Sequence, residues 1–238
     1  MVAVPCSCFT SKRETMNFDS GDNDFYIYNA NHRFAAMYPL LARQIIDDYG
    51  MDKGTVLDVG TGGAPLPIEL AGISDLDLIG LDMKAEALAI ARQNIARRHM
   101  PRDRITLIQG DVRSIPLPDD SVDLIISRGS IPFWEDMAAS FADVNRVLAS
   151  GGTTFIGCGF SRYQPIEEVR KMRPAWSKKG SKDYRNAWKQ KGRIPKALKE
   201  AGVERFRILG DEYGLWVEIT KPIPSSCNIK KPNLIGTV

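Results

Sequence analysis

The chain of 238 residues and 26.5 kDa is long enough for one large α/β domain. Its content of 43% hydrophobic and 26% charged residues is that of a globular protein and excludes a disordered, collagenous or coiled-coil chain. No window approaches the roughly 18 apolar residues of a membrane span, and the N-terminus lacks the order of a secretory signal, so we expect a cytoplasmic protein with no membrane partner. Four cysteines are too few for a disulfide scaffold.

The net charge of +3 conceals an uneven distribution along the chain. Residues 1–160 contain 14 Lys and Arg against 21 Asp and Glu, a net charge of −7, whereas residues 161–205 contain 14 against 5, a net charge of +9. A local basic surface can meet nucleic acid or an anionic substrate, and it is also typical of a solvated helical surface. The charge alone leaves these interpretations open.

Two elements are expected before the first strand. The segment Phe18–His32 is polar, aromatic and rich in Asn, Asp and Gly, which is typical of a lid or a loop. In Phe34–Tyr49 apolar residues recur at helical spacing, so we expect an amphipathic helix whose first turn is shaped or split by Pro39.

From Thr55 onward, short apolar runs alternate with amphipathic helices. The expected strands are Thr55–Gly60, Asp77–Asp82, Ile105–Asp111, Val122–Arg128 and Thr153–Phe160. The expected helices are Pro65–Gly72, Ala85–His99 and Met137–Ser150. This βαβα order predicts an α/β fold with a doubly wound parallel sheet that helices cover on both faces.

The C-terminal part of the pattern is different. After a helix over Ile194–Val203, the apolar runs Arg205–Leu209 and Leu215–Lys221 are separated by five turn residues, which predicts a β-hairpin. The last strand must then run antiparallel to its neighbour. An ordinary dinucleotide dehydrogenase sheet does not end in this way.

A glycine-rich turn, DVGTGGA, follows the first expected strand and precedes a helix. Glycine lets a ligand approach the backbone closely and tolerates positive φ, so the turn marks a nucleotide-type pocket at the carboxyl end of the strand. The dehydrogenase fingerprint would need a further glycine at Pro65, which weakens a pyrophosphate-binding interpretation. Asp58 precedes the first glycine, where its carboxylate is placed to hold an ammonium group or to orient the loop.

Two further carboxylates stand at the ends of the next strands. Asp82 ends the second strand, the position at which a carboxylate accepts hydrogen bonds from a ribose diol in dinucleotide-binding folds. Met83 follows it as a soft apolar platform for an adenine ring. Asp111, after Gly110 at the end of the third strand, is placed to meet a purine amino group. A loop carboxylate that caps a helix would explain any one of these alone, but three at consecutive strand ends favour a binding site.

The segments VLDVGTGGAPLPIELA, IGLDMKAEALAIARQNI, GDVRSIPLPDDSVDLIISRGSIPFWED and FADVNRVLASGGTTFIGCGF, with the closing hairpin, resemble the class I S-adenosylmethionine-dependent methyltransferases. The resemblance covers about Thr55–Lys221 and is nearest to the branch that includes ubiquinone and menaquinone C-methyltransferases. It implies a Rossmann-like sheet of seven strands with the seventh antiparallel, S-adenosylmethionine as cofactor and a small-molecule acceptor. The family often has a third glycine where this chain has Ala64, which is expected to leave less room in the loop.

Carried over by position, the resemblance assigns the cofactor contacts. Asp58, Gly60 and Gly62, with Thr61 between the two glycines, would line the methionine end, and Asp82 would hold the ribose. The adenine would lie between Met83 and Val112, with its amino group on Asp111 next to Gly110, and Ser127 and Arg128 at the end of the fourth strand would border the transferable methyl group.

Methyl transfer needs few catalytic groups, because a sulfonium methyl is already activated and positioning can suffice. The chain's candidates for a general base are His32, Tyr26, Tyr28 and Tyr163, and we favour His32 and Tyr28, with Arg128 beside the methyl group, as catalytic residues. A surface or capping role is an equal explanation for His32. Phe133 and Trp134 are candidate walls of an apolar acceptor pocket, and core packing explains them equally well.

Two alternatives use residues outside these loops. The segment 171–193 interleaves aromatic and basic residues, as RNA-binding surfaces do, although we favour a cover over the substrate pocket. The pattern typical of base-methylating enzymes is absent after the fourth strand, so nucleic acid is the less favoured partner. Cys6 and Cys8 suggest methylation of a thiol-bound metalloid; no metal site is expected. We expect a tail and lid over 1–33, the methyltransferase domain over 34–221 with a basic insertion over 161–193, and a tail over 222–238.

Overall fold

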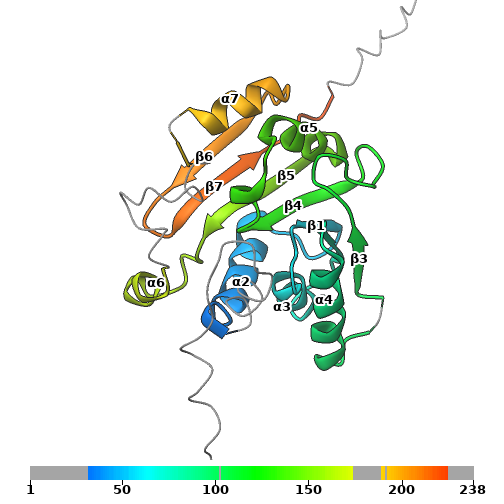
Figure 1. Ribbon diagram of the computed structural model, residues 1–238, viewed down its shortest axis with the longest axis vertical. Helices are drawn as coiled ribbons and strands as arrows, with labels where there is room; N and C mark the ends of the chain where they lie inside the picture. The colour runs from blue at the N-terminus through cyan, green and yellow to red at the C-terminus, as the bar shows by residue number, and fades with distance from the viewer. Residues whose placement is uncertain (1–31, 102, 174–188, 191, 225–238) are drawn as a thin grey trace, which may run out of the picture.

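A computed structural model describes residues 32–101, 103–173, 189–190 and 192–224 (Figure 1). Most of the expected lid, most of the basic segment 171–193 and the end of the C-terminal tail lie outside these residues. The structure therefore bears on the domain that the sequence predicts over 34–221, apart from the gaps.

The described strands form one seven-stranded sheet in the order β3-β2-β1-β4-β5-β7-β6. They are β1 (Thr55–Val59), β2 (Asp77–Asp82), β3 (Ile105–Gln109), β4 (Val122–Arg128), β5 (Leu148–Gly159), β6 (Phe206–Gly210) and β7 (Gly214–Ile219). Neighbouring strands are parallel except that β7 is antiparallel to both β5 and β6. The doubly wound sheet with an antiparallel last strand is confirmed.

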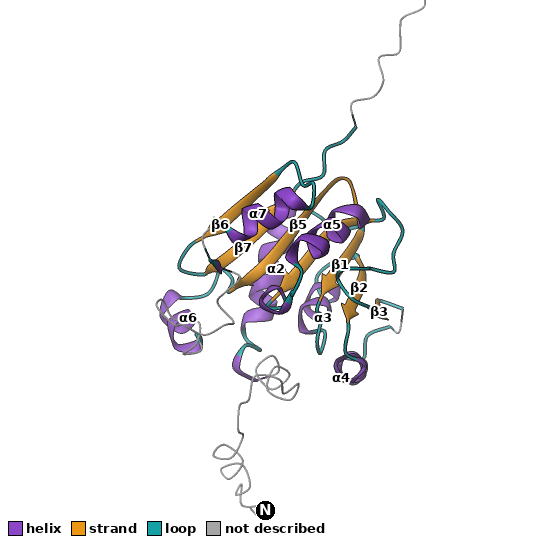
Figure 2. Ribbon diagram, turned by 45° about the horizontal axis from the view of Figure 1, so that its top comes forward, coloured by secondary structure: helices purple, strands orange, loops and turns teal. Residues whose placement is uncertain are grey.

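Helices cover both faces of the sheet (Figures 1 and 2). They are α2 (Met37–Tyr49), α3 (Pro65–Ala71), α4 (Ala85–Arg97), the 3-10 helix η2 (Ile131–Phe133), α5 (Met137–Val147), α6 (Ile166–Met172) and α7 (Arg193–Glu200). Successive side chains of a strand point to opposite faces, so Val56 packs with α2, α3 and α4, and Leu57 packs with α5 and α7. No helix in the described part is long and apolar enough to cross a bilayer.

Pro39 does not split the first expected helix. Helix α2 begins at Met37, three residues later than expected, and continues through Pro39 to Tyr49. The first turn of a helix has backbone N–H groups without intrahelical acceptors, so a proline there removes no hydrogen bond. Gly50 ends the helix in the left-handed conformation and donates its N–H to the Ile46 carbonyl.

The boundary between α5 and β5 differs from the expectation. The helix was expected to reach Ser150, but it ends at Val147 and the strand begins at Leu148. Leu148 pairs with Val122, and the next pair is Thr153 with Leu124, so β5 bulges between these two pairs. The residues after Val147 therefore form a strand because they pair with β4, and the helical periodicity of the sequence cannot predict this pairing.

The region after β5 adds one short helix, α6, inside the segment that the sequence assigns to a basic insertion. The closing hairpin is confirmed, with β6 and β7 joined by a tight turn. In this turn the Asp211 carboxylate accepts hydrogen bonds from the N–H groups of Tyr213 and Gly214, at 2.7 and 3.1 Å.

Candidate cofactor and substrate site

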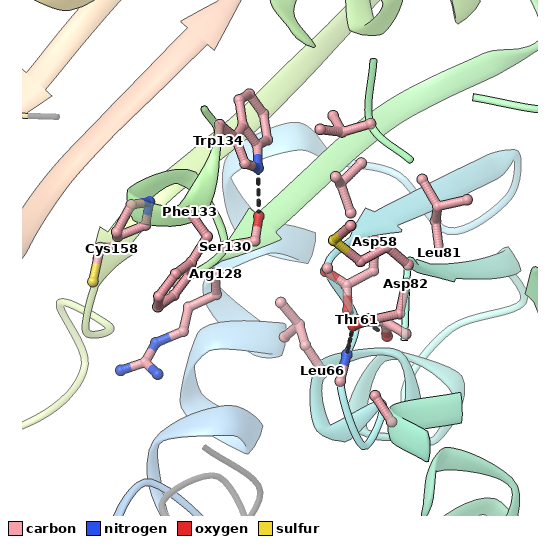
Figure 3. A pocket seen from close by; sticks show the side chains of 18 of the residues that line it. Asp58, Thr61, Leu66, Leu81, Asp82, Arg128, Ser130, Phe133, Trp134 and Cys158 are labelled. Atoms are coloured by element: carbon pink, nitrogen blue, oxygen red, sulfur yellow. Dashed lines mark hydrogen bonds between the residues drawn. The ribbon is translucent and has the colours of Figure 1, made fainter. Parts of the chain in front are cut away.

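A cavity of about 430 Å³ lies at the carboxyl ends of the parallel strands (Figure 3). From β1 the chain winds outward through β2 and β3, and it then returns to β4 on the other side of β1. The loops after β1 and β4 therefore diverge, and such a switch point is the usual ligand site of an open α/β sheet. The volume is within the range of roughly 300–1,000 Å³ typical of small-molecule sites.

The glycine-rich turn forms the floor of the cavity beside β1. Its Gly60 and Gly62 have φ angles of +71° and +56°, which an L side chain rarely adopts. The N–H groups of Gly60 and Thr61 both donate to the Leu81 carbonyl, at 2.8 and 2.9 Å, so the turn is fixed to the end of β2. A Cβ atom on Gly60 would lie 2.3 Å from Ser130 Cβ, which shows how closely the turn packs against the loop after β4.

Ala64 takes the place of the third glycine and does not line the cavity. The residue is fully buried, adopts a φ angle of +56° and is absent from the cavity wall. Its methyl group packs in the core under α3. The departure from the family pattern therefore places an alanine in left-handed backbone, at a cost of about 1–2 kcal/mol, outside the cavity wall.

Asp58 is the most deeply buried carboxylate of the cavity, with 4% of its surface exposed. The Thr61 hydroxyl donates to its Oδ2 at 2.8 Å. Burial raises the pKa of Asp58 to about 7, and the nearby Asp82 carboxylate adds to this rise, whereas the hydrogen bond from Thr61 opposes it. A buried group with such a pKa binds a proton or a cation, so Asp58 is suited to an ammonium ligand.

Asp82 connects the glycine-rich turn to the helix that follows β2. Its Oδ2 accepts the Gly62 N–H at 2.9 Å, and its Oδ1 accepts the Lys84 N–H at 3.0 Å. Each oxygen retains lone-pair capacity for a ligand hydroxyl. Met83, beside it, lines the cavity with 62% of its surface exposed, so the side chain is available to cover a flat ligand.

The loop after β3 supplies Gly110, Asp111 and Val112 to the cavity wall. The Asp111 carboxylate already has a partner, because the Arg113 side chain donates to both of its oxygens, at 2.6–3.1 Å. These bonds hold the pKa of Asp111 below its ordinary value. The sequence analysis did not predict this ion pair. Because Arg113 keeps Asp111 ionised and does not use all of its lone pairs, the carboxylate can still accept a hydrogen bond from a ligand amino group.

Ser127 and Arg128, which are both predicted to border the methyl group at the end of β4, have different positions in the structure. Ser127 is buried and does not line the cavity; its hydroxyl donates to the Val59 carbonyl at 2.7 Å and lies 2.5 Å from the Ser130 hydroxyl. Ser130 lines the cavity and accepts the Trp134 indole N–H at 3.1 Å. Ser127 therefore supports the loop from behind, and Phe133, Trp134 and Arg128 form the wall.

The two base candidates that the structure describes, His32 and Tyr163, do not line the cavity. His32 is exposed, and it does not line the cavity. Tyr163 is 41% exposed and donates its hydroxyl to Asp47 on the outer surface of α2, at 2.8 Å. Tyr26 and Tyr28 lie outside the described residues. These roles remain predictions.

Other side chains in the wall escaped sequence reasoning as site residues. Phe34 and Tyr38 reach the cavity from α2 and the segment before it, and Cys158 and Phe160 reach it from the end of β5. Phe34 and Phe160 meet edge to face, with 5.9 Å between their ring centroids. The positions of Cys158 and Phe160 at a strand end were a usable signal, but those of Phe34 and Tyr38 depend on how α2 packs across the sheet.

No group of three His, Cys, Asp or Glu side chains in the described residues is arranged to hold a metal ion. Of the cysteines, Cys158 is a free thiol in the cavity wall, and the remaining three lie outside the described ranges. Metalloid methylation through Cys6 and Cys8 thus stays a prediction.

The fold and the acidic strand ends are typical of a nucleotide-cofactor protein with a doubly wound sheet. Residues 57–156 match the family model described as a methyltransferase domain. The chain is 31% identical over 129 residues to the uncharacterised methyltransferase YdaC of Bacillus subtilis, covering 53% of this chain and 68% of that protein. It is 30% identical over 107 residues to the demethylmenaquinone methyltransferase of Chlorobaculum tepidum, covering 45% and 41%.

Among solved structures, a candidate S-adenosyl-L-methionine-dependent methyltransferase of Methanococcus maripaludis aligns with a TM-score of 0.75 and 34% identity, covering 86% of this chain and 94% of that one. The chain belongs to the class I S-adenosylmethionine-dependent methyltransferases. The family resemblance read from the sequence is confirmed, and S-adenosylmethionine is the cofactor of this family. The chain spans less than half the length of the demethylmenaquinone methyltransferase.

Proposed function

We propose that the protein transfers a methyl group from S-adenosylmethionine to a small-molecule acceptor by in-line displacement. One observation carries this proposal: a single cavity joins the acidic loops after β1, β2 and β3 to a second end walled by Phe34, Phe133 and Phe160. The first end suits a nucleoside with a charged tail, and the second gives space for an apolar acceptor beside it.

The residues of the first end fit the parts of S-adenosylmethionine one by one. The Asp58 carboxylate would hold the ammonium group, and Asp82 would accept hydrogen bonds from the ribose hydroxyls. Asp111 would accept the adenine amino group, with the ring between Met83 and Val112. The glycine-rich turn would let the methionyl part approach the backbone, because Gly60 and Gly62 carry no Cβ atom.

When bound, S-adenosylmethionine supplies a methyl group already activated by a sulfonium. Bound there, it would offer its methyl carbon to the acceptor's nucleophilic atom and would keep the electron pair of the broken carbon–sulfur bond on sulfur, and an acceptor proton, where one is lost, would pass to solvent or a base. The cavity's contribution is to hold the nucleophile about 3 Å from the carbon and in line with the breaking bond. Trp134 and Phe133 would exclude water from this end.

The Asp58 assignment predicts a pH dependence of cofactor binding. Below pH 7 the buried carboxylate is protonated, so an ammonium ligand must displace a proton, and affinity for S-adenosylhomocysteine should rise by up to about tenfold per pH unit from about pH 5.5 to 7. The ligand's own amino group stays protonated in this range. Asp58→Asn should bind weakly with a flat profile, measured by calorimetry. An unchanged slope in this variant would contradict the role of Asp58.

The acceptor class is tested by turnover. Purified protein and S-adenosylmethionine are incubated with either the low-molecular-mass filtrate or the RNA fraction of a cell extract, and S-adenosylhomocysteine is quantified. The proposal expects product with the filtrate and none with RNA, and it expects Asp82→Ala to lower the signal. Product formed with the RNA fraction alone would overturn it in favour of the RNA alternative based on segment 171–193.

A further inference from the structure

Arg128 is a charged group inside the cavity wall without a carboxylate counter-ion in the described part of the chain. It is half-buried, and its Nε donates to the Gly159 carbonyl at 3.2 Å. Seven described arginines pair with carboxylates, namely Arg43, Arg98, Arg113, Arg146, Arg162, Arg170 and Arg207, whereas Arg128 and Arg173, which both line the cavity, have no carboxylate partner among the described residues. Removing a cation from water is costly unless a counter-ion replaces the water, so the position of Arg128 calls for an anion.

Aromatic rings fix the guanidinium of Arg128 in place. Its central carbon lies 4.3 Å from the Phe34 ring centroid, 5.7 Å from that of Phe160 and 5.8 Å from that of Tyr38. Such contacts partly offset the loss of water and hold the planar group in one orientation. The Gly159 carbonyl engages Nε and Tyr38 interacts with the guanidinium, so within the described residues the terminal nitrogens keep capacity for a ligand.

The two ends of the cavity differ in charge. The carboxylates of Asp58, Asp82 and Asp111 stand at the ends of β1, β2 and in the loop after β3, where Lys84 and Arg113 also line the cavity, whereas Arg128 ends β4 beside β5 and Arg173 follows α6. Figure 3 shows Arg128, with Phe133 and Cys158, across the cavity from Asp58 and Asp82. A ligand anion at the Arg128 end therefore meets cations and rings rather than the acidic cofactor loops.

We infer that Arg128 binds an oxyanion carried by the methyl acceptor, so that the acceptor class is an organic anion, a carboxylate or a phosphate on an apolar ring or chain. This inference rests on the proposed function. The guanidinium fork matches both oxyanions through paired hydrogen bonds, and Phe34, Phe133 and Phe160 would contact the apolar body. The oxyanion would anchor the acceptor while another of its atoms receives the methyl group.

The test uses small probes on the full-length protein saturated with S-adenosylhomocysteine. Benzoate, phenyl phosphate and the neutral benzamide are titrated, and binding is followed by nuclear magnetic resonance. We expect one or both anions to bind more tightly than benzamide, and the better anion identifies the oxyanion. Arg128→Met should lower the affinity for that anion by about tenfold or more, and Arg128→Lys should lower it less. The affinity for benzamide should not change in either variant. Equal binding of the three probes, or an anion insensitive to Arg128→Met, would overturn the inference.

A second arm separates the acceptor's oxyanion from the carboxylate of the cofactor itself. Affinities for S-adenosylhomocysteine and for 5′-methylthioadenosine, which lacks the methionyl carboxylate, are compared in the wild type and in Arg128→Met. We expect the ratio of the two affinities to be unchanged. A selective loss for S-adenosylhomocysteine would assign Arg128 to the cofactor. Arg162→Met, on the outer surface, is the matched control. Failure of S-adenosylhomocysteine to bind the wild type would instead contradict the proposed function.

Discussion

Replacing Gly60 with alanine is expected to lower the free energy of unfolding by roughly 2–5 kcal/mol and to weaken S-adenosylhomocysteine binding by more than about tenfold. The φ angle of +71° disfavours any L side chain, and the new Cβ would lie 2.3 Å from Ser130 Cβ. Relief of this overlap must separate the turn after β1 from the loop after β4. Both segments line the cavity, so its shape changes with them. Thermal unfolding and titration calorimetry measure the two effects.

Two further variants separate backbone strain from the overlap. Gly50 has a similar φ angle of +62°, but a Cβ there meets nothing within 4 Å, so Gly50→Ala should lose only about 1–2 kcal/mol and bind the ligand normally. The double variant Gly60→Ala with Ser130→Gly removes the clashing Cβ and should recover part of the affinity. Wild-type affinity in Gly60→Ala alone would refute this packing argument.

Asp82→Ala is expected to weaken S-adenosylhomocysteine binding by about 1–3 kcal/mol, the scale of hydrogen bonds to a charged group. The variant loses the proposed acceptor of the ribose hydroxyls and also the carboxylate that holds the Gly62 and Lys84 N–H groups. Asp82→Asn should lose almost as much, because one oxygen becomes a donor that faces a backbone N–H. Calorimetry measures both variants.

Asp77→Ala is the matched control for Asp82, since it removes an exposed carboxylate from the opposite end of β2. We expect its affinity to equal that of the wild type. If Asp82→Ala also binds as the wild type does, the carboxylate has no part in holding the ribose.

The order of strands and helices was predictable because local patterns determine it. The apolar run of β1, the glycine-rich turn and the amphipathic α4 follow directly from side-chain periodicity and turn chemistry. The start of β5 was not predictable, because Leu148 becomes a strand residue only through its pairing with Val122. Pairing across 26 positions of sequence leaves no trace in a local window.

Some residues of the site were predictable from the sequence and others were not. The carboxylates of Asp58, Asp82 and Asp111 were predictable as cavity residues, because parallel strands bring their carboxyl ends to one edge. Tyr38 was not, because it reaches the cavity from a helix that precedes the sheet in sequence. Arg113 was missed as the partner of Asp111 because an ion pair between residues two apart depends on the shape of the loop.

The most direct test of the cofactor site is a crystal structure of the full-length protein grown with S-adenosylhomocysteine. We expect the nucleoside in the cavity at the ends of β1, β2 and β3, its ribose hydroxyls within hydrogen-bonding distance of the Asp82 carboxylate and its amino group beside Asp58. A ligand bound elsewhere, or a cavity that stays empty at saturating ligand, would contradict the assignment of these loops to the cofactor.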